Sequence, residues 1–439
     1  MAGGYRHIMA KTIIYADWVT EDSASTVDGI LVGELNSDQI RSSELFRFHY
    51  DKQWIKDGGS AIDPELDLYE GDHFSDSLNF RCFLDSCPDR WGRLLMDRRE
   101  AIYARDEKRL ERKLTEMDYL LGVHDQYRMG GLRYKTEAGG EFKDNNADLA
   151  APPMASLKEL EYAASKIEDE AIDDPLYITW LNQLISPGSS LGGARPKACV
   201  IDDENALWIA KFPNKHDNFN VGAWEYVAYL MAIDCGIEMS LSKVEKINGT
   251  QHTFMTKRFD RRVCDENKQV RVHFSSAMTQ LGYRDGEQGA SYLELCEYLT
   301  NNGAKTADDL EQLWLRIVFS IAISNSDDHL RNHGFLLSTH GWVLSPAYDI
   351  NPIPKSTGLN LNINETENRL DFALALETIA YYRVESDEAE SIINSVCEVV
   401  KHWRDNATKV GISRAEQDLM ASCFSAAKNW KKADINNAN

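Results

Sequence analysis

Apolar residues recur at helical spacing in the second half of the chain, whereas shorter runs separated by turn-forming residues prevail in the first half. One stripe consists of Leu310, Leu313, Trp314, Ile317, Val318 and Ile321. Because these positions share one face of a helix, the pattern predicts a helix buried in a core. A second stripe consists of Trp224, Val227, Ala228 and Met231, which predicts a helix over residues 220–236.

Shorter apolar runs predict strands. Single strands are expected at 43–50 and 252–258. A pair of strands is expected within 198–213, around a turn at 202–204. Hairpins are expected at 27–35 and 335–344. Gly29 and Gly33 suggest the turn of the first hairpin. Residues 91–121 predict helix, with the mixed charges of 105–113 on a solvated face. A β-containing half therefore precedes a helical half.

Turn-forming residues are densest at 136–156, where two glycines, an Asp-Asn-Asn cluster and two prolines mark a linker. We place a domain boundary near residue 150 on this basis. The length of 439 residues agrees with two to three domains.

The charge limits the classes of function. Lys and Arg total 48 against 70 Asp and Glu, so the formal net charge is −22. The overall electrostatic field of such a chain repels nucleic acid, so the chain is a poor candidate for binding nucleic acid through its net charge. No apolar run reaches the length of a membrane span, and residues 1–11 lack the apolar core of a signal peptide. The eight scattered cysteines are expected to be reduced thiols, and we expect a cytoplasmic protein.

Residues 189–197, with the sequence SSLGGARPK, have mostly small side chains. Its backbone N–H groups could approach an anion closely, and Lys197 could add a positive charge. The segment lacks the Walker A pattern, and by itself an ordinary glycine-rich turn explains it equally well. Lys211 ends the following predicted strand, as the phosphate-binding lysine of protein kinases does, although a strand lysine reaching solvent is the simpler alternative. Glu225 on the next helix has the sign to orient it.

The most informative segment follows the predicted core helix. Residues 324–334 read SNSDDHLRNHG, and a polar run there is costly unless it lines a cleft or is fully hydrogen-bonded. Asp327 and Asn332 have the spacing of the kinase catalytic loop, in which the aspartate accepts a hydroxyl proton and the asparagine binds Mg²⁺. Asp349 follows one hairpin later, where a kinase places its metal-binding aspartate.

A metal-dependent phosphohydrolase is the alternative from another enzyme class. Aspartate and histidine are common metal ligands, and the loop holds four of them: Asp327, Asp328, His329 and His333. The two histidines would share a face only in a helix, and Gly334 interrupts that pattern. The order of the kinase-like residues therefore favours phosphoryl transfer.

Five segments together resemble the HipA family, bacterial serine/threonine kinases that act as toxins of type II toxin–antitoxin systems. The segments are 83–92 (FLDSCPDRWG), 189–197 (SSLGGARPK), 257–261 (KRFDR), 325–335 (NSDDHLRNHGF) and 344–349 (LSPAYD). The resemblance implies an α+β, two-lobed, protein-kinase-like fold with an N-terminal β-containing subdomain and a helical C-terminal lobe. The expected divisions are 1–150 for the N-terminal subdomain, 151–265 for the nucleotide-binding core and 266–439 for the helical lobe.

The resemblance also implies a role for each matching residue. Asp327 would be the catalytic base, Asn332 and Asp349 would hold Mg²⁺, and Ser190 would be autophosphorylated, with Ser189 as its competitor. The residues implied to contact ATP are Gly192, Gly193, Ala194, Arg195, Pro196, Lys197, Lys211, Lys257, Arg258, Phe259, His329 and Tyr348. Asp328 departs from some members of the family, which have glycine there.

The implied partner is a HipB-like helix-turn-helix antitoxin, through which operator DNA would mainly be bound. The implied substrate is a translation-related protein, such as an aminoacyl-tRNA synthetase. A weakly active ATP-binding subunit of a repressor complex is the second alternative.

Overall fold

A computed structural model describes residues 9–19, 29–40, 43–75, 79–145, 152–169, 176–185, 193–264 and 269–431. These residues group into two compact units, one containing Met1–Ala210 with Asp260–Ser275, the other Lys211–Phe259 with Ser276–Asn439. The first division falls inside a strand, so that Lys211 belongs to the second unit. The predicted three-part division stays a prediction.

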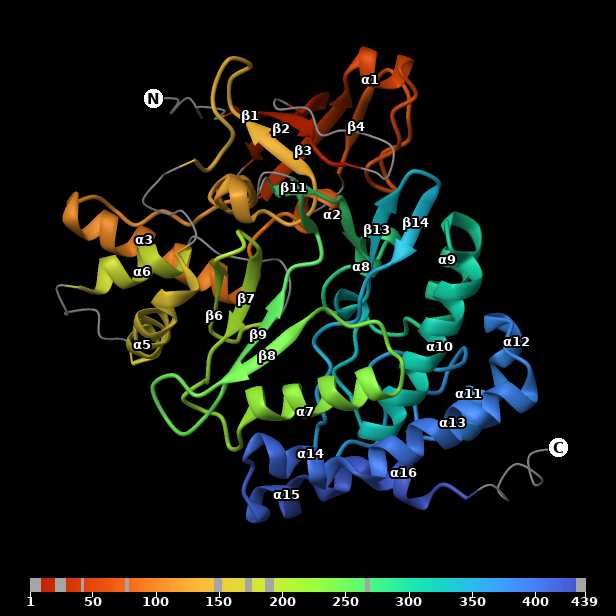
Figure 1. The fold of residues 1–439 in the computed structure, drawn as a ribbon. Helices are drawn as coiled ribbons and strands as arrows, with labels where there is room; N and C mark the ends of the chain where they lie inside the picture. Colours follow the sequence, from red (N-terminus) through yellow and green to blue (C-terminus); the bar gives the residue numbers. More distant parts are fainter. Residues whose placement is uncertain are drawn as a thin grey trace. The chain divides into compact units, whose positions relative to one another are not determined.

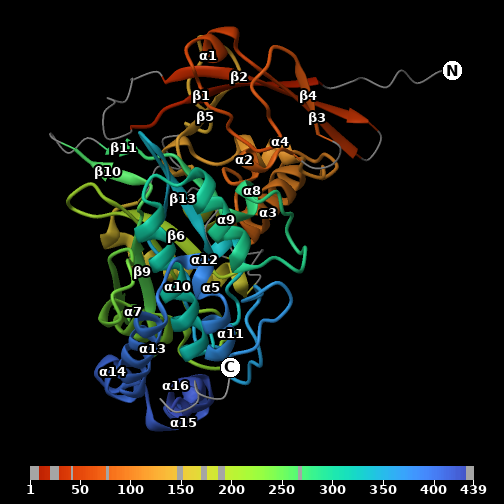
Figure 2. The ribbon, with the colours of Figure 1, turned by 90° about the vertical axis from the view of Figure 1, so that its right-hand side faces the viewer.

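The first unit contains a five-stranded antiparallel sheet in the order β4-β3-β2-β1-β5 (Figure 2). Its strands are β1 (Met9–Ala16), β2 (Ile30–Ile40), β3 (Ser43–Tyr50), β4 (Asp72–Phe74) and β5 (Leu132–Lys135). Phe46 and Phe48 of β3 form a buried cluster with side chains of other elements, including Phe83 of α2. The members of this cluster all precede the predicted linker.

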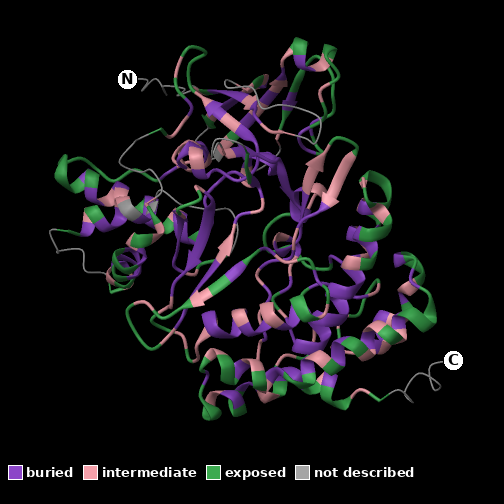
Figure 3. Cartoon of the chain, in the orientation of Figure 1, coloured by how far each residue is buried: buried purple, intermediate pink, exposed green. Residues whose placement is uncertain are grey.

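The remaining elements of the first unit are helical or form smaller strand groups. The helices are α1 (Lys52–Lys56), α2 (Arg81–Leu84), α3 (Arg90–Asp106), α4 (Glu116–Leu121), α5 (Leu157–Glu168) and α6 (Tyr177–Ile185), with 3₁₀ turns η1 (Asp125–Tyr127) and η3 (Met154–Ser156). The further strands are β6 (Lys197–Ile201), β7 (Leu207–Lys211), β10 (Arg261–Val263), β11 (Gln269–Arg271) and β12 (Phe274–Ser276). The neighbouring strands β6 and β7 are almost wholly buried (Figure 3).

The second unit is mainly helical, with two hairpins (Figure 1). Its helices are α7 (Val221–Asp234), α8 (Ala277–Gln280), α9 (Tyr292–Asn302), α10 (Thr306–Ile323), α11 (Phe372–Glu377), α12 (Ile379–Tyr382), α13 (Ser386–Lys401), α14 (Trp403–Val410), α15 (Arg414–Met420) and α16 (Ser425–Asn429), with 3₁₀ turns η5 (Leu330–Asn332) and η6 (Ala421–Phe424). The hairpins are β8 (Ser242–Glu245) with β9 (Thr253–Lys257), and β13 (Gly334–Ser338) with β14 (Gly341–Leu344).

Helix α10 is the centre of the second unit. The whole predicted apolar stripe is buried, and the helix contacts α9, α11, α12, α13 and α16. It ends where Ser324 adopts a left-handed conformation with φ 56°, which turns the chain sharply into the polar segment. The predicted core helix is confirmed, and it fixes the point at which the candidate catalytic loop begins.

Two predictions of local structure are wrong. Gly33 does not turn the chain but lies inside β2, where a Cβ atom would come within 2.2 Å of the backbone oxygen of His49. Glycine is needed there for close approach of two strands, which a search for turn residues cannot distinguish from a turn. The charged run 105–113, predicted to be a solvated face of a helix, is exposed but lies mostly outside the helices, because α3 ends at Asp106 and α4 begins at Glu116. Between them Lys108 has a positive φ of 54°, which a helix does not accommodate.

Candidate active site

The predicted catalytic loop joins α10 to β13. Asp327 is exposed, whereas Asn332 is buried within the turn η5. The side-chain Nδ2 of Asn332 donates to the backbone oxygen of Asp327 at 2.9 Å, and the backbone N–H of His329 donates to the same oxygen at 3.0 Å. The structure therefore brings the predicted base and one predicted metal ligand into direct contact through the backbone.

Asp328, directly after the predicted base, points into the core. Its carboxylate accepts from the hydroxyl of Tyr292 at 2.5 Å and of Ser320 at 3.3 Å, and Nε2 of His333 lies 2.9 Å away. Burial alone would raise the pKa of Asp328, but His333 and the Tyr292 hydroxyl lower it below its usual value. Asp328 is therefore held as a carboxylate inside the protein.

Lys211, the first residue of the second unit, contacts helix α7 and the segment after β14. Its Nζ atom lies 2.6 Å from Oε1 of Glu225 on α7 and 2.5 Å from Oδ1 of Asp349 after β14. Burial by itself would lower the pKa of Lys211, but the charges of Asp349 and Glu225 raise it above its usual value. The lysine is therefore a fixed positive charge, oriented by the glutamate that the sequence suggested.

Asp349 lies in a strained backbone position, with φ 57°. Nδ2 of Asn351 contacts its Oδ1 at 3.4 Å, and the backbone N–H of Asn351 donates to Oδ1 of Asn325 at 3.1 Å. Oδ1 of Asn351 is buried and has no hydrogen-bond partner in the described part of the chain. Mg²⁺ prefers oxygen ligands such as a carboxylate and an amide oxygen that has no hydrogen-bond partner. Asp349 and Asn351 therefore fit that metal.

The predicted adenine-binding residues lie partly together. The rings of Phe259 and Tyr348 are 5.5 Å apart, and the Tyr348 hydroxyl donates to the backbone oxygen of Arg331 at 2.7 Å. Lys257 ends strand β9, and the side chain of Arg258 is buried. Nδ1 of His329 is a buried nitrogen without a hydrogen-bond partner among the described residues.

The glycine-rich segment belongs to the first unit, and only its second half is described. Ser189, Ser190 and Gly192 lie outside the described residues, and Gly193, Ala194, Arg195 and Pro196 lead into β6. Nζ of Lys197 lies 2.5 Å from Oδ2 of Asp89 and donates to the backbone oxygen of Gly193 at 2.8 Å. The side chain of Lys197 is only 1% exposed, so the described position of this lysine is a buried ion pair.

The residues of the alternative metal site are divided between surface and core. Asp327 is exposed, whereas Asp328 and His333 contact each other inside the protein. Among the residues that the structure describes, no three His, Cys, Asp or Glu side chains are grouped to hold a metal ion. The geometry thus offers the phosphohydrolase alternative no support.

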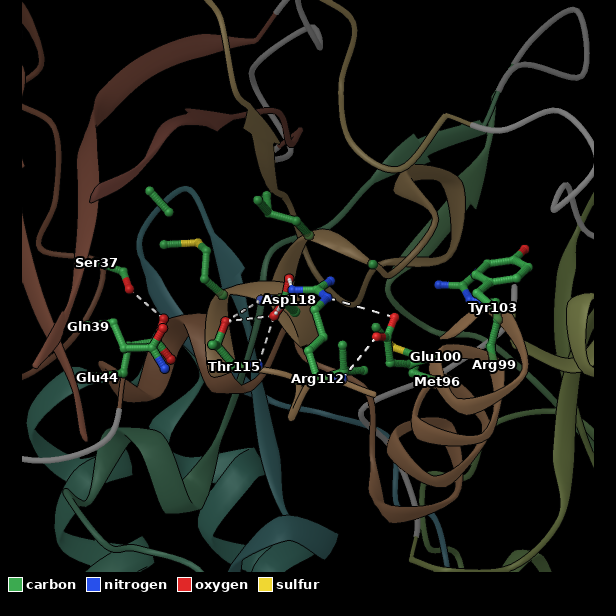
Figure 4. A pocket seen from close by; sticks show the side chains of 15 residues that line it. Ser37, Gln39, Glu44, Met96, Arg99, Glu100, Tyr103, Arg112, Thr115 and Asp118 are labelled. Atoms are coloured by element: carbon green, nitrogen blue, oxygen red, sulfur yellow. Dashed lines mark hydrogen bonds and ion pairs between the residues drawn. The ribbon is translucent and has the colours of Figure 1, made fainter. Parts of the chain in front are cut away.

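A separate cavity of about 500 Å³ lies in the first unit (Figure 4). It is lined by residues of β1, β2, β3, α3 and α4 and of the segment between the two helices. Its acidic groups are already engaged: Glu44 accepts from the backbone N–H of Glu116, and Arg112 lies between Glu100 and Asp118. No residue predicted for the active site lines this cavity.

Sequence reasoning missed Asn325, Asn351 and the engagement of Asp328. An asparagine two residues after a predicted metal ligand is a signal that could have pointed to Asn351. Nothing in the sequence shows which of two adjacent aspartates faces the core. No helix of the described chain combines the length and the apolar character that crossing a bilayer requires.

Comparison with known proteins adds family and fold. Residues 189–403 match the family model of the HipA-like C-terminal domain, while no curated protein matched the chain. The fold is similar to that in a structure of the Shewanella oneidensis MR-1 toxin–antitoxin system, which contains HipA, HipB and its operator DNA. The TM-score is 0.63 and the sequence identity is 16%, and the match covers 92% of this chain and 95% of that chain. The Helicobacter pylori proinflammatory kinase CtkA gives TM-score 0.35 and 14% identity, covering 55% and 95%. The predicted α+β fold is confirmed, and it is that of the HipA structure.

Proposed function

Since this chain belongs to the HipA family through its HipA-like C-terminal domain, we propose that it transfers the γ-phosphoryl group of Mg-ATP to a serine or threonine of a protein. The observation that carries the proposal is the position of Lys211 Nζ, 2.6 Å from Glu225 and 2.5 Å from Asp349. A lysine held by a helix glutamate beside a metal-binding aspartate is the arrangement that kinases need for catalysis.

The residues divide the chemistry of transfer between them. The substrate hydroxyl oxygen bonds to the γ-phosphorus, the bond from that phosphorus to the β,γ-bridging oxygen breaks, and ADP leaves. Asp327, exposed at the loop, accepts the hydroxyl proton. Lys211 neutralises phosphate charge, while Asn332 and Asp349 would hold Mg²⁺. Bound Mg²⁺ would supply further positive charge at the phosphates.

The nucleotide would also be held by backbone groups. We assign Gly192 to Lys197 to the phosphates, and Lys257, Arg258, Phe259, His329 and Tyr348 to the base and sugar, on the family resemblance. Autophosphorylation of Ser190, with Ser189 as competitor, would add about two negative charges beside the ATP phosphates and oppose ATP binding. Mass spectrometry of the purified chain after incubation with Mg-ATP identifies the modified serine.

The biological role that we propose is that of a toxin in a type II toxin–antitoxin module. The similar Shewanella structure contains HipA, HipB and operator DNA, which supports a HipB-like antitoxin as partner of this chain. The substrate would be a translation-related protein, such as an aminoacyl-tRNA synthetase. Phosphoproteomics after induction, compared with Asp327→Asn, would name it.

Asp327→Asn tests the catalytic base. The amide cannot accept the proton, so phosphate transfer from radiolabelled ATP should fall by about 10²-fold or more, while ATP binding stays nearly intact. The control is Asp308→Asn, which changes an exposed aspartate in the first turn of α10. Equal labelling of Asp327→Asn and wild type would show that the base is assigned wrongly.

The same assay separates the two alternatives. Release of phosphate from a generic ester without ATP, stimulated by Mn²⁺ or Zn²⁺, would favour the phosphohydrolase. Binding of ATP and antitoxin without measurable transfer would favour a weakly active subunit of a repressor complex.

A further inference from the structure

Two adjacent aspartates have opposite environments at the start of the catalytic loop. Asp327 is exposed, whereas the side chain of Asp328 is 6% exposed. Oδ1 of Asp328 lies 2.9 Å from Nε2 of His333, and its Oδ2 accepts from the hydroxyls of Tyr292 and Ser320. The buried carboxylate thus contacts three parts of the second unit: α9, α10 and the residue before β13.

Burial of a carboxylate is costly unless its oxygens are satisfied, so these contacts hold Asp328 in one place. Tyr292 is wholly buried, and its ring meets the ring of His333 edge-on at 5.7 Å. Ser320 lies on the central helix of the unit, where it also accepts from Nδ2 of Asn325 at 3.3 Å. The carboxylate is therefore attached to parts of the core that cannot shift without repacking.

The contact between Asp328 and His333 joins the two ends of the functional loop. Asp328 directly follows the base Asp327, and His333 directly follows the metal ligand Asn332. We call this contact the loop clip. We propose that the loop clip sets the separation between Asp327 and Asn332, and so keeps the base at a fixed position relative to the metal site. The loop clip rests on the proposed function, and Asp328 and His333 act in it as positioning residues.

A second buried side chain of α10 contacts the segment before the second metal ligand. Arg316 on α10 is buried, and its charge interacts with that of Asp328. Its Nη2 donates to the backbone oxygen of Ser345 at 2.7 Å, four residues before Asp349. Helix α10 therefore contacts Asp328 through Ser320 and the segment before Asp349 through Arg316.

Three variants test the loop clip: Asp328→Asn, His333→Phe and the double variant. Each single variant leaves one partner of a buried contact alone and should lower thermal stability, whereas the double variant should regain part of it. The turnover number, corrected for the folded fraction, should fall by about tenfold or more in all three, because a small displacement of reacting groups is costly. The Mg²⁺ concentration for half-maximal rate should rise several-fold in all three.

The control is Gln417→Ala. Gln417 is buried in α15 and donates to the backbone oxygen of Ile412 at 3.0 Å, so its loss lowers stability without touching the loop. Its turnover number and Mg²⁺ dependence should match those of wild type. The control thus shows what lost stability alone does to the rate.

The outcomes separate the loop clip from the proposed function. A turnover number that recovers with stability in the double variant, or that stays at wild-type level in the single variants, overturns the loop clip alone. A wild-type chain without phosphate transfer or ATP binding overturns the proposed function, and the loop clip falls with it. Low turnover of the double variant despite recovered stability supports the loop clip. If a single variant fails to fold, the double variant and the control decide the question.

Discussion

A single lysine links two carboxylates at the centre of the candidate site. Lys211 is buried between Glu225 and Asp349, so one positive charge faces two negative charges in a place with little water. The excess negative charge is compatible with a site that receives a divalent cation. Since Asp349 is the more exposed of the two carboxylates, at 23% against 4%, it is the one that solvent and ligands reach more easily.

Replacement of Lys211 by methionine should affect both rate and stability. Without the ammonium group the buried Glu225 and the partly buried Asp349 repel each other, and the free energy of unfolding should fall by about 3 kcal/mol. Loss of a charge that stabilises the transferred phosphate should reduce kcat by about 10²-fold or more. Steady-state kinetics with ATP and urea unfolding measure the two effects.

Lys211→Arg is the matched variant that keeps the charge. It should retain most of the stability but not the rate, because the planar guanidinium does not reproduce the position of one ammonium group. Wild-type kcat in Lys211→Met would contradict the proposed role of this lysine.

At the scale of elements, a buried ion pair joins the start of α3 to the start of β6. Asp89 caps α3 by accepting from the backbone N–H of Gly92 at 2.9 Å, and its second oxygen faces Lys197. Burial raises the pKa of Asp89, although the charge of Lys197 opposes the shift. Lys197 also binds the backbone oxygen of Gly193, so the pair anchors the end of the glycine-rich segment to α3.

Asp89→Ala should therefore destabilise the first unit strongly. The variant removes a helix cap and leaves Lys197 as an uncompensated buried charge, with an expected cost of about 3–5 kcal/mol. The double variant Asp89→Leu with Lys197→Met should recover much of this loss, because no charge is left buried. Urea unfolding of the full chain measures both, and equal stability of Asp89→Ala and wild type would contradict the anchoring role.

The elements also show where local patterns suffice. The buried helix α10, the helix α7, the strand β3 and the hairpin of β13 and β14 lie where the sequence predicts them, since their apolar spacing is regular. The prediction for Gly33 was wrong because the outcome depended on the backbone of the neighbouring strand. A glycine required by the backbone of His49 looks like any other glycine in the sequence.

For the whole molecule, the net charge of −22 affects which partners it can bind alone. ATP is itself a polyanion, so binding depends on local positive charge such as Lys211 rather than on the average charge. Operator DNA is much longer and would meet the acidic chain over a larger area. We therefore expect contact with DNA mainly through a basic antitoxin bound to this chain.

The isolated chain should bind operator DNA no more tightly than a dissociation constant of about 10⁻⁶ M at physiological ionic strength. The chain together with the proposed HipB-like antitoxin should bind about 10²-fold more tightly or better, because a specific interface would then be present. Fluorescence anisotropy with labelled operator DNA, at two salt concentrations, measures both. Tight binding by the isolated chain would contradict this inference.

The sequence by itself determined the order of the functional groups and the main core helix. Asp327, Asn332 and Asp349 lie within 23 positions of one another, so their spacing along the chain was enough to suggest their chemistry. The regular apolar stripe of α10 was likewise local information. These features need no knowledge of distant residues.

Only the tertiary structure decided which side chains meet across long separations. Lys211 reaches Asp349 over 138 positions and Lys197 reaches Asp89 over 108, and the burial of Asp328 depends on Tyr292, 36 residues away. Such contacts arise because a carboxylate or ammonium group that leaves water must find partners, and packing decides which partners are near. The exposure of Asp327 and the burial of Asp328 differ for this reason, although the two residues are identical and adjacent in the sequence.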